Sequence, residues 1–310
     1  MQPKKHDRSI LSMKPESRQA AARLQPPMSM SSSPPLAATR SPAATIGVFD
    51  SGVGGLTVLR ALQQALPQAA LHYVADAAHA PYGPRSPDFI RERSLRLADY
   101  LVSQGAGMLV VACNTATAHA IAALRQRWPE LPIVGTEPGI KPAVAASLAR
   151  TKGQRGSRIG VLATVATIAS ARYQDLISRH AEGIEVFSQP CPGLVDLIER
   201  GQLDTPELHA LLDRLCQPLR EAGVDTVLMG CTHYPLVQPA LQRALGPQVQ
   251  LLNIETAVAQ RAAALWGRQD VGSEARPTLR LETTGEAARL QDFVRQVLAW
   301  PDAQAVRVQA

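Results

Sequence analysis

The fold is decided by residues 46–66, which read IGVFDSGVGGLTVLRALQQAL. A short apolar run ends in the acid Asp50, and a glycine-rich turn follows over residues 51–55. Leucines then recur at helical spacing until Pro67 ends the pattern. The stretch therefore predicts a strand, a tight turn and a helix, which together form the building unit of a parallel α/β sheet.

The same alternation continues along the first half of the chain. Apolar runs predict strands over residues 71–75 and 107–112, and helical periodicity predicts helices over residues 89–104 and 116–128. A loop rich in turn-forming residues separates the second strand from the second helix. Strands that alternate with helices are joined by crossover connections, so we expect a parallel sheet.

The second half of the chain repeats the pattern of the first. Residues 158–164 (RIGVLAT) are similar to residues 46–49 (IGVF), and residues 226–232 (TVLMGCT) are similar to residues 109–114 (LVVACN). Self-similarity of this kind indicates repeated structural units. We therefore infer an internal duplication of two α/β units.

One cysteine occupies the same place in each unit. Ile46 precedes Cys113 by 67 residues, and Ile159 precedes Cys231 by 72 residues. Each of these cysteines follows the predicted carboxyl end of a strand and comes just before a helix. Open α/β sheets bind their ligands at that edge, so we expect both thiols at a functional site.

The predicted fold class is α/β, with two pseudo-symmetric doubly wound domains, parallel sheets and an active site between them. Residues 132–142 are rich in proline and glycine and predict a crossing between the halves. We expect residues 251–253 to form the returning strand, and helices over residues 255–266 and 286–300 to close the first domain. The predicted domains are residues 45–138 plus 251–310 for the first and residues 139–250 for the second.

Residues 1–44 differ from the rest of the chain. They hold Pro34-Pro35, a run of three serines and scattered charges with no sustained period, which predicts a disordered extension. The alternative is a true start at Met28 or Met30. This segment carries seven basic and two acidic side chains, whereas the rest of the chain carries 25 basic and 24 acidic ones. The body therefore lacks the basic surplus of a dedicated DNA-binding protein, and we expect no dominant nucleic-acid binding.

Membrane and export signals are missing from the sequence pattern. No apolar run reaches the length of about 18 residues that a membrane-spanning helix needs. The first residues lack the apolar core of a secretory signal. We therefore expect a cytoplasmic protein, whose four cysteines are free thiols in a reducing compartment.

Cys113 and Cys231 are the candidate catalytic residues. A helix N-terminus favours a thiolate, and His233 lies close enough in sequence to Cys231 to act as its proton partner. The plainer interpretation is that a lone cysteine is a small buried hydrophobe. We apply that interpretation to Cys191 and Cys216, which do not lie at a strand end. A zinc site at residues 231–233 would need further ligands at close spacing, so we expect no metal.

Two equivalent thiols suit one kind of reaction. If the two units face each other, a small substrate between them has one thiol on each side. One thiolate removes the α-proton while the opposite thiol donates a proton, so the stereocentre inverts. The reverse reaction exchanges the two roles, and identical side chains on a pseudo-twofold axis meet that requirement.

The glycine-rich turn after Asp50 predicts a small anion or ammonium site. Glycines allow close approach of a ligand to the backbone, and the following helix offers free N–H groups. The spacing differs from the GxGxxG fingerprint of dinucleotide sites, so we expect no dinucleotide cofactor. We expect Asp50 to hold an ammonium group or assist a thiol, and Ser51 to hydrogen-bond a carboxylate.

Four ordered motifs resemble the glutamate racemase family over the chain from about residue 45 onward. They are residues 49–58 (FDSGVGGLTV), 81–83 (PYG), 112–116 (ACNTA) and 230–235 (GCTHYP). The resemblance implies an isomerase without pyridoxal phosphate or other cofactor, which supplies D-glutamate for peptidoglycan synthesis, cell wall biogenesis and cell shape.

The resemblance also implies roles for single residues. Cys113 would act on the α-proton of D-glutamate with help from Asp50, and Cys231 on that of L-glutamate with help from His233. The substrate site would be lined by Asp50, Ser51, Tyr82, Gly83, Asn114, Thr115, Thr232 and His233. Glu199 matches a family acid with a supporting role, and Thr167 matches a substrate contact.

Two segments depart from the family pattern. Residues 252–254 (LNI) stand where the family usually has an Asp-Ser pair, and residues 281–282 (LE) stand where an aromatic residue is common. Both lie away from the two thiols in sequence, so we expect them to affect packing and regulation rather than chemistry.

Other functions remain open at this stage. An aspartate or hydantoin racemase of the same superfamily would share the thiols, and a two-domain small-molecule binding protein would not need them. The resemblance also leaves open a homodimer and a secondary partner such as DNA gyrase.

Overall fold

The computed structural model describes residues 45–151, 156–267, 277–300 and 302–310. These residues belong to one compact unit. The predicted extension over residues 1–44, and the choice of Met28 or Met30 as its start, lie outside the described residues.

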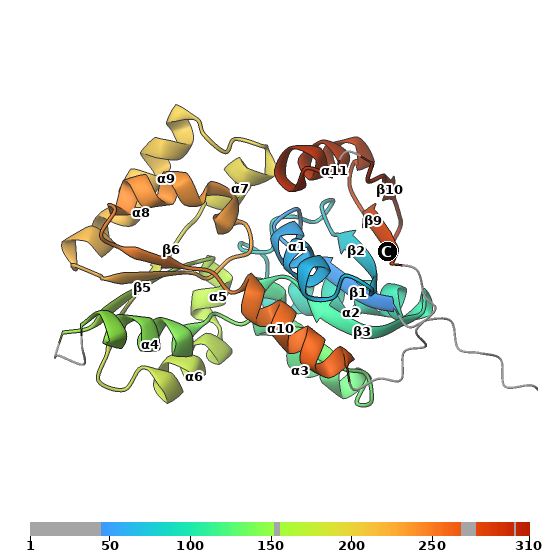
Figure 1. Cartoon of the computed structure of the whole chain (residues 1–310), viewed down its shortest axis with the longest axis horizontal. Coiled ribbons are helices and arrows are strands. Elements are labelled where there is room, and N and C mark those ends of the chain that lie inside the picture. The colour runs from blue at the N-terminus through green and yellow to red at the C-terminus, as the bar shows by residue number, and fades with distance from the viewer. Residues whose placement is uncertain (1–44, 152–155, 268–276, 301) are drawn as a thin grey trace, which may run out of the picture. The chain divides into compact units, whose positions relative to one another are not determined.

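Among the described residues, the first sheet has six strands in the order β10-β9-β2-β1-β3-β4, all paired in parallel (Figure 1). Its strands are β1 (Thr45–Asp50), β2 (Ala70–Ala75), β3 (Ala106–Val111), β4 (Ile133–Gly135), β9 (Leu279–Thr283) and β10 (Ala305–Arg307). The side chains of β1 are buried on both sides because helices cover both faces of the sheet. Ile46 and Val48 pack into one apolar cluster, and Phe49 packs into the other.

Five helices cover the two faces of this sheet. They are α1 (Leu56–Ala65), α2 (Pro87–Ser103), α3 (Asn114–Arg127), α10 (Glu255–Trp266) and α11 (Ala287–Phe293). Helices α1, α10 and α11 bury their apolar residues in the same cluster as Ile46, whereas α2 and α3 pack on the face that holds Phe49. The helix order along the chain thus places α1 and α3, the two helices that follow β1 and β3, on opposite faces.

The second sheet has four described strands in the order β6-β5-β7-β8, again all parallel. They are β5 (Arg158–Ala163), β6 (Glu185–Pro190), β7 (Thr226–Met229) and β8 (Gln250–Leu252). The helices of this half are α4 (Ile140–Arg150), α5 (Val165–Ala169), α6 (Ala171–His180), α7 (Leu194–Glu199), α8 (Pro206–Glu221) and α9 (Gln238–Leu245), with a 3₁₀ turn η1 (Tyr234–Val237).

The strand orders match between the two sheets. The order β6-β5-β7-β8 repeats β2-β1-β3-β4, and the first sheet adds β9 and β10 at its edge. The predicted α/β class with two pseudo-symmetric parallel sheets is therefore confirmed. The boundaries of the two domains stay a prediction.

Two details of the sequence prediction are wrong. We expected residues 251–253 to return the chain to the first domain, but β8 pairs with β7 in the second sheet. The reason is the duplication itself, since β8 is the counterpart of β4.

We also expected one helix over residues 286–300. Helix α11 instead ends at Phe293, a π-helical turn η2 (Val294–Leu298) follows, and Ala299 has a φ of 52°. This left-handed residue stops the helix before β10 runs beside β9.

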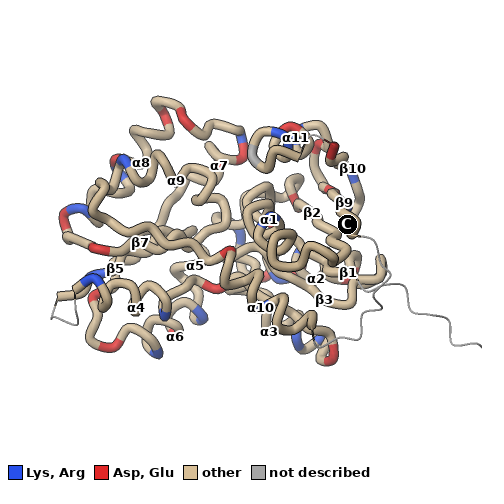
Figure 2. Tube along the Cα trace, in the orientation of Figure 1, with Lys and Arg blue, Asp and Glu red and all other residues tan. Residues whose placement is uncertain are grey.

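Charged side chains lie mainly on the outer helices and loops. Basic and acidic residues are interspersed there, and the strands are largely uncharged (Figure 2). One exception is Glu282 on β9, within residues 281–282, where an aromatic residue is common in the family. Its buried carboxylate contacts His72 Nε2 at 2.7 Å and accepts a hydrogen bond from the Tyr100 hydroxyl at 2.8 Å. No helix among the described residues combines the length and apolarity that crossing a membrane requires.

Glu255 lies where the chain re-enters the first half. It directly follows residues 252–254, which differ from the usual family sequence. Its side chain is only 7% exposed, at the start of α10. Burial raises the pKa of Glu255, and the backbone N–H groups and the Thr57 hydroxyl only partly oppose this effect. The charged form of this acid therefore costs folding free energy.

The replacement Glu255→Gln is expected to stabilise the protein at neutral and alkaline pH. Because the folded-state pKa lies above the ordinary value of 4.5, the parent protein loses stability as the pH rises through that folded-state value. The amide does not ionise, so Tm should rise by a few degrees at pH 8 and change little at pH 4.5. Calorimetry at both pH values measures the effect. Glu182→Gln, at an exposed position, is the control, and an equal change at both pH values would contradict the argument.

Candidate active site

The glycine-rich turn between β1 and α1 is the centre of the site. Side chains of the protein itself contact the backbone N–H groups that this turn exposes. Gly55 donates to Asp50 Oδ2 at 2.6 Å, and Val53 donates to Glu199 Oε1 at 2.8 Å. The Gly54 N–H lies 3.3 Å from His233 Nε2. We expected this turn to receive a small anion or an ammonium group of a ligand. In the structure its N–H groups bind the carboxylates of Asp50 and, from the other half of the chain, Glu199.

Two glycines are required because these side chains dock against the turn. A Cβ atom at Gly52 would lie 1.8 Å from Glu199 Oε1, and one at Gly54 would lie 2.3 Å from His233 Nδ1. Neither position has room for a larger residue unless the docked side chain moves. The Tyr73 hydroxyl fixes the same turn by donating to the Gly52 carbonyl at 2.7 Å.

Cys231, His233 and Glu199 form a chain of contacts. Cys231 Sγ lies 3.7 Å from His233 Nδ1, and His233 Nε2 lies 2.6 Å from Glu199 Oε1. A separation of 2.6 Å needs a proton between the two atoms, so Nε2 carries a hydrogen and donates it to Glu199. Nε2 then has no lone pair for the Gly54 N–H, and we regard the 3.3 Å contact as packing.

The protonation of His233 follows from these neighbours. Burial alone would lower the pKa of His233, but the hydrogen bonds with Cys231 and Glu199 outweigh it and hold that pKa well above its usual range. Glu199 is the reverse case, since burial would raise its pKa and the bonds to His233 and to the Val53 N–H lower it instead. The resulting imidazolium is held by a carboxylate and lies beside the sulfur of Cys231.

Cys113 has different surroundings. It caps the N-terminus of α3, where its Sγ accepts a hydrogen bond from the Ala116 N–H at 3.4 Å and donates to Ser51 Oγ at 3.6 Å. Burial and the neighbouring Asp50 carboxyl raise the pKa of Cys113 well above the usual range for a thiol. A helix N-terminus favours a thiolate, but at this position desolvation acts more strongly in the opposite direction.

Asp50 connects the turn to Cys113. It is fully buried, and burial raises its pKa, although the positive charge of His233 and the Gly55 N–H act in the opposite direction. The Ser51 hydroxyl donates to Asp50 Oδ1 at 3.4 Å and lies next to the Cys113 thiol. The structure thus gathers both cysteines, Asp50, Ser51 and His233 around one turn.

A second group of predicted residues forms a buried hydroxyl cluster. Thr115 Oγ1 lies 2.9 Å from Thr164 Oγ1 and 3.2 Å from Thr167 Oγ1. Thr115 begins α3, whereas Thr164 caps α5 at the end of β5, so the cluster joins the two halves. The sequence analysis did not single out Thr164. Its position directly after β5, equivalent to that of Ser51 after β1, was the signal that could have identified it.

Asn114 presents a free acceptor beside this cluster. Its Nδ2 donates to the Thr136 carbonyl at 3.0 Å, which fixes the orientation of the amide. Its Oδ1 is buried and has no hydrogen-bond partner among the described residues. A buried acceptor without a partner is costly, so this atom is suited to a ligand donor such as an ammonium group.

Tyr82 and Gly83 lie on a loop that is anchored by a residue the sequence analysis missed. The Tyr82 hydroxyl donates to Asp76 Oδ2 at 2.6 Å, and Arg93 clamps the same carboxylate through Nε at 3.0 Å and Nη2 at 2.8 Å. Asp76 is fully buried, yet these bonds lower its pKa against the effect of burial. Gly83 faces Thr164 of the second half, where a Cβ atom would lie 3.2 Å from the Thr164 Cβ.

The remaining candidates take other positions. Thr232 contributes its carbonyl, which accepts from the Thr57 hydroxyl at 3.2 Å. Cys191 and Cys216 are free and buried, and burial raises the pKa of each thiol to about 12. Within the described part of the chain, no group of three or more His, Cys, Asp and Glu residues could hold a metal ion.

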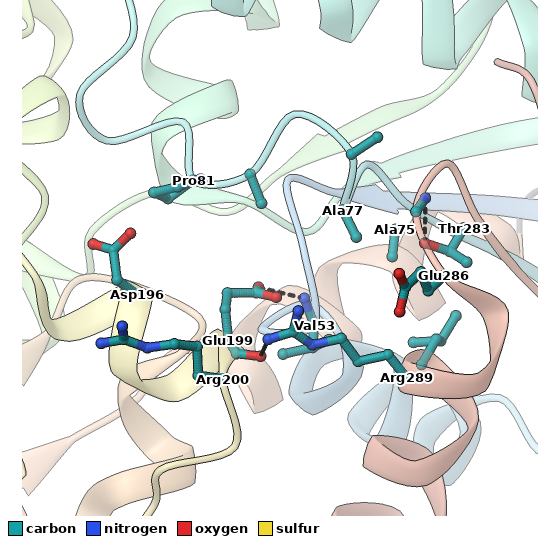
Figure 3. A pocket seen from close by; sticks show the side chains of 14 residues that line it. Val53, Ala75, Ala77, Pro81, Asp196, Glu199, Arg200, Thr283, Glu286 and Arg289 are labelled. Carbon is teal, nitrogen blue, oxygen red and sulfur yellow. Dashed lines mark hydrogen bonds between the residues drawn. The ribbon is translucent and has the colours of Figure 1, made fainter.

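A cavity of about 390 Å³ adjoins the site (Figure 3). Its lining includes Val53 of the turn, Pro81 of the loop, Glu199 of α7 and Arg289 of α11. The cavity lies where segments of both halves meet. The Glu199 side chain reaches from its rim to the Val53 N–H, as the dashed line in Figure 3 marks.

Comparison with known proteins agrees with this geometry. The profile of the family described as Asp/Glu/Hydantoin racemase matches residues 46–262. A glutamate racemase of Pseudomonas aeruginosa is 51% identical over 218 residues, which are 70% of this chain and 80% of that protein. The crystal structure of a glutamate racemase isoform from Bacillus anthracis has a TM-score of 0.75 at 31% identity, over 86% of this chain and 97% of that chain. That of Escherichia coli glutamate racemase, in complex with L-glutamate and the activator UDP-MurNAc-ala, has a TM-score of 0.72 at 31% identity, over 82% and 95% of the two chains.

The replacement Gly52→Ala tests the docking of Glu199. The new methyl group would occupy the space of the flexible Glu199 carboxylate, so we expect that side chain to leave His233 while the fold persists. Loss of the carboxylate should lower the pKa of His233, which an NMR titration of the imidazole measures.

Gly267→Ala is the matched control. Gly267 has a helical φ of −64°, and the nearest atom to its Cβ position is the Ala263 carbonyl oxygen at 3.5 Å. This variant should leave the titration of His233 unchanged. An unchanged titration in Gly52→Ala as well would show that the glycine is not needed for the His233–Glu199 contact.

Proposed function

The chain belongs to the Asp/Glu/Hydantoin racemase family, and we propose that it interconverts L- and D-glutamate with Cys113 and Cys231 as the two acid/base groups. The observation that carries this proposal is the position of the two thiols. They follow the equivalent strands β3 and β7 of the duplicated units, and both lie beside the same glycine-rich turn. The proposed product, D-glutamate, would supply peptidoglycan synthesis, as the family resemblance implies.

The two thiols differ in a way that suits the conversion of L-glutamate to D-glutamate. The imidazolium of His233 beside Cys231 favours a sulfur anion that can accept the α-proton of L-glutamate. The raised pKa of Cys113 keeps that residue as a thiol, which can donate its proton to the opposite face of the α-carbon. One proton is removed and one is supplied, so the product is D-glutamate. Cys231 ends as the thiol and Cys113 as the thiolate.

The reverse reaction starts from that second state. The Cys113 thiolate then removes the α-proton of D-glutamate and Cys231 returns its proton to the other face. Burial and Asp50 oppose a negative charge on Cys113, so that thiolate needs compensation. Its hydrogen bond from the Ala116 N–H and the ammonium group of a bound amino acid are the groups that can provide it.

The substrate contacts follow from the polar groups around the turn. The unpaired Asn114 Oδ1 can accept a hydrogen bond from the substrate ammonium. The hydroxyl groups of Thr115, Thr164 and Thr167 can donate to a carboxylate once they give up their contacts with one another. We assign Ser51, Tyr82, Gly83 and Thr232 to the rest of the substrate site on the family motifs that they match.

The main alternative is another amino acid substrate for the same two thiols. Relatives at 45–51% identity are named glutamate racemase, which supports glutamate over aspartate or a hydantoin. A binding protein without catalysis would have no need of matched thiols next to an imidazolium.

The substrate prediction is tested by exchange of the α-proton in D₂O. We expect deuterium to enter both L- and D-glutamate without added cofactor, and the optical rotation of either enantiomer to decay to zero. Proton NMR follows the loss of the α-proton. Aspartate and a hydantoin are run in parallel, and faster exchange with either of them would assign the chain to that substrate instead.

The roles of the cysteines are tested by Cys113→Ser and Cys231→Ser. Each should lower racemisation by roughly 100-fold or more, the usual contribution of a positioned acid or base. Residual exchange should survive only for the enantiomer that faces the remaining thiol, which is L-glutamate in Cys113→Ser and D-glutamate in Cys231→Ser. Cys216→Ala, in the buried core of the second half, is the control. Racemisation at the parent rate in either serine variant would remove that cysteine from the mechanism.

A further inference from the structure

The end of helix α7 is held by a side chain from the other half of the molecule. The last carbonyl groups of a helix lack partners within the helix. Three of them in α7 are satisfied locally, by the N–H groups of Arg200, Gly201 and Gln202. The fourth, the main-chain carbonyl of Glu199, accepts from Arg289 Nη2 at 2.6 Å (Figure 3).

Arg289 connects α7 to the first sheet. It lies on α11, which packs against β9 and β10, whereas α7 packs against α8 and η1. Glu199 is thus held at two points by the first half, since its carboxylate accepts from the Val53 N–H and its carbonyl accepts from Arg289. Val53, Glu199 and Arg289 all line the cavity shown in Figure 3.

The charge of Arg289 acts on the same residue. Together with His233 and the Val53 N–H, the guanidinium lowers the pKa of Glu199 against the effect of burial. The other charged or titratable groups around Glu199 come from the turn after β1, the segment after β7, and helices α7 and α11. They are Asp50, Cys231, His233, Asp196, Arg200 and Glu286.

We propose that Arg289 is a positioning residue, which holds the end of α7 so that the Glu199 carboxylate stays on His233 beside Cys231. The proposal rests on the proposed function, because it gives Cys231 an acid/base role. It assigns α11, which is remote from both thiols in sequence, to the control of one of them. Arg289 acts through Glu199 and does not contact the reacting atoms.

The replacement Arg289→Ala is expected to change the pH dependence of racemisation. With α7 released, Glu199 no longer holds the proton on His233, and the imidazolium is lost at lower pH. The alkaline limb of kcat/KM should therefore move to lower pH. At the alkaline end of the profile, kcat/KM should fall roughly threefold to tenfold, the range expected for the loss of one ordinary hydrogen bond. Arg289→Lys keeps a cationic donor and should restore much of the parent profile.

Two further variants separate positioning from a general loss of structure. Arg295→Ala removes an exposed arginine that follows α11 and pairs with Asp292, so its pH profile should match that of the parent. In a Glu199→Gln background the carboxylate is already absent, so Arg289→Ala should produce no further movement of the alkaline limb. A movement of the same size in that background would overturn the proposal, because Arg289 would then act independently of Glu199.

An NMR titration of His233 gives a readout that does not depend on activity. Arg289→Ala should lower the pKa of the imidazole, in the same direction as Glu199→Gln. If the parent protein fails to racemise glutamate, the proposed function fails, yet the titration still reports whether Arg289 holds Glu199 on His233. A parent-like titration and a parent-like pH profile in Arg289→Ala would together refute the positioning role.

Discussion

The contact on which the rest of the site depends is the insertion of His233 and Glu199 into the glycine-rich turn after β1. One carboxylate oxygen lies 2.6 Å from the imidazole and 2.8 Å from the Val53 N–H, so it joins a side chain of the second half to the backbone of the first. The contact links the two halves through side chains that are largely buried, since the exposed fraction is 2% for the His233 side chain and 14% for that of Glu199. It also explains the glycines, since Cβ atoms at Gly52 and Gly54 would occupy the space of the docked side chains.

The same contact makes a duplicated fold chemically asymmetric. Strand order and cysteine position repeat between the halves, but the neighbours of the sulfur atoms do not. Cys231 has an imidazolium backed by a carboxylate, whereas Cys113 has a hydroxyl and the buried Asp50. The proposed racemisation, which removes a proton on one face and supplies one on the other, needs two thiols in different protonation states at the start. The unequal surroundings of the two sulfur atoms support that part of the proposal.

Much of this architecture was predictable from local sequence. Apolar runs and turn residues act over a few positions, so β1, β2, β3, β5 and β7, the helix over Glu255–Trp266 and the corner positions of the cysteines follow from pattern alone. The side chains that contact the turn do not, because Glu199 lies 146 residues from Val53 in sequence and His233 lies 179 residues from Gly54. Asp76 was missed for the same reason. Its importance comes from Tyr82, Arg93 and Thr284, which converge on it only in the folded chain. The raised pKa of Cys113 also could not be predicted, since it depends on how completely the site is buried.

Burial of the site keeps the two thiols away from water. Cys113 is 4% exposed and Cys231 is 6% exposed. The contacts between the two halves around them include the threonine cluster, the Thr57–Thr232 bond and the His119 bond to the Ala166 carbonyl at 2.9 Å. The hydrogen bond from the Val53 N–H to Glu199 also joins the two halves, and it is one of the interactions that lower the pKa of Glu199 against the effect of burial. The proposed chemistry at Cys231 therefore depends on the same contacts between the halves that exclude water from the site.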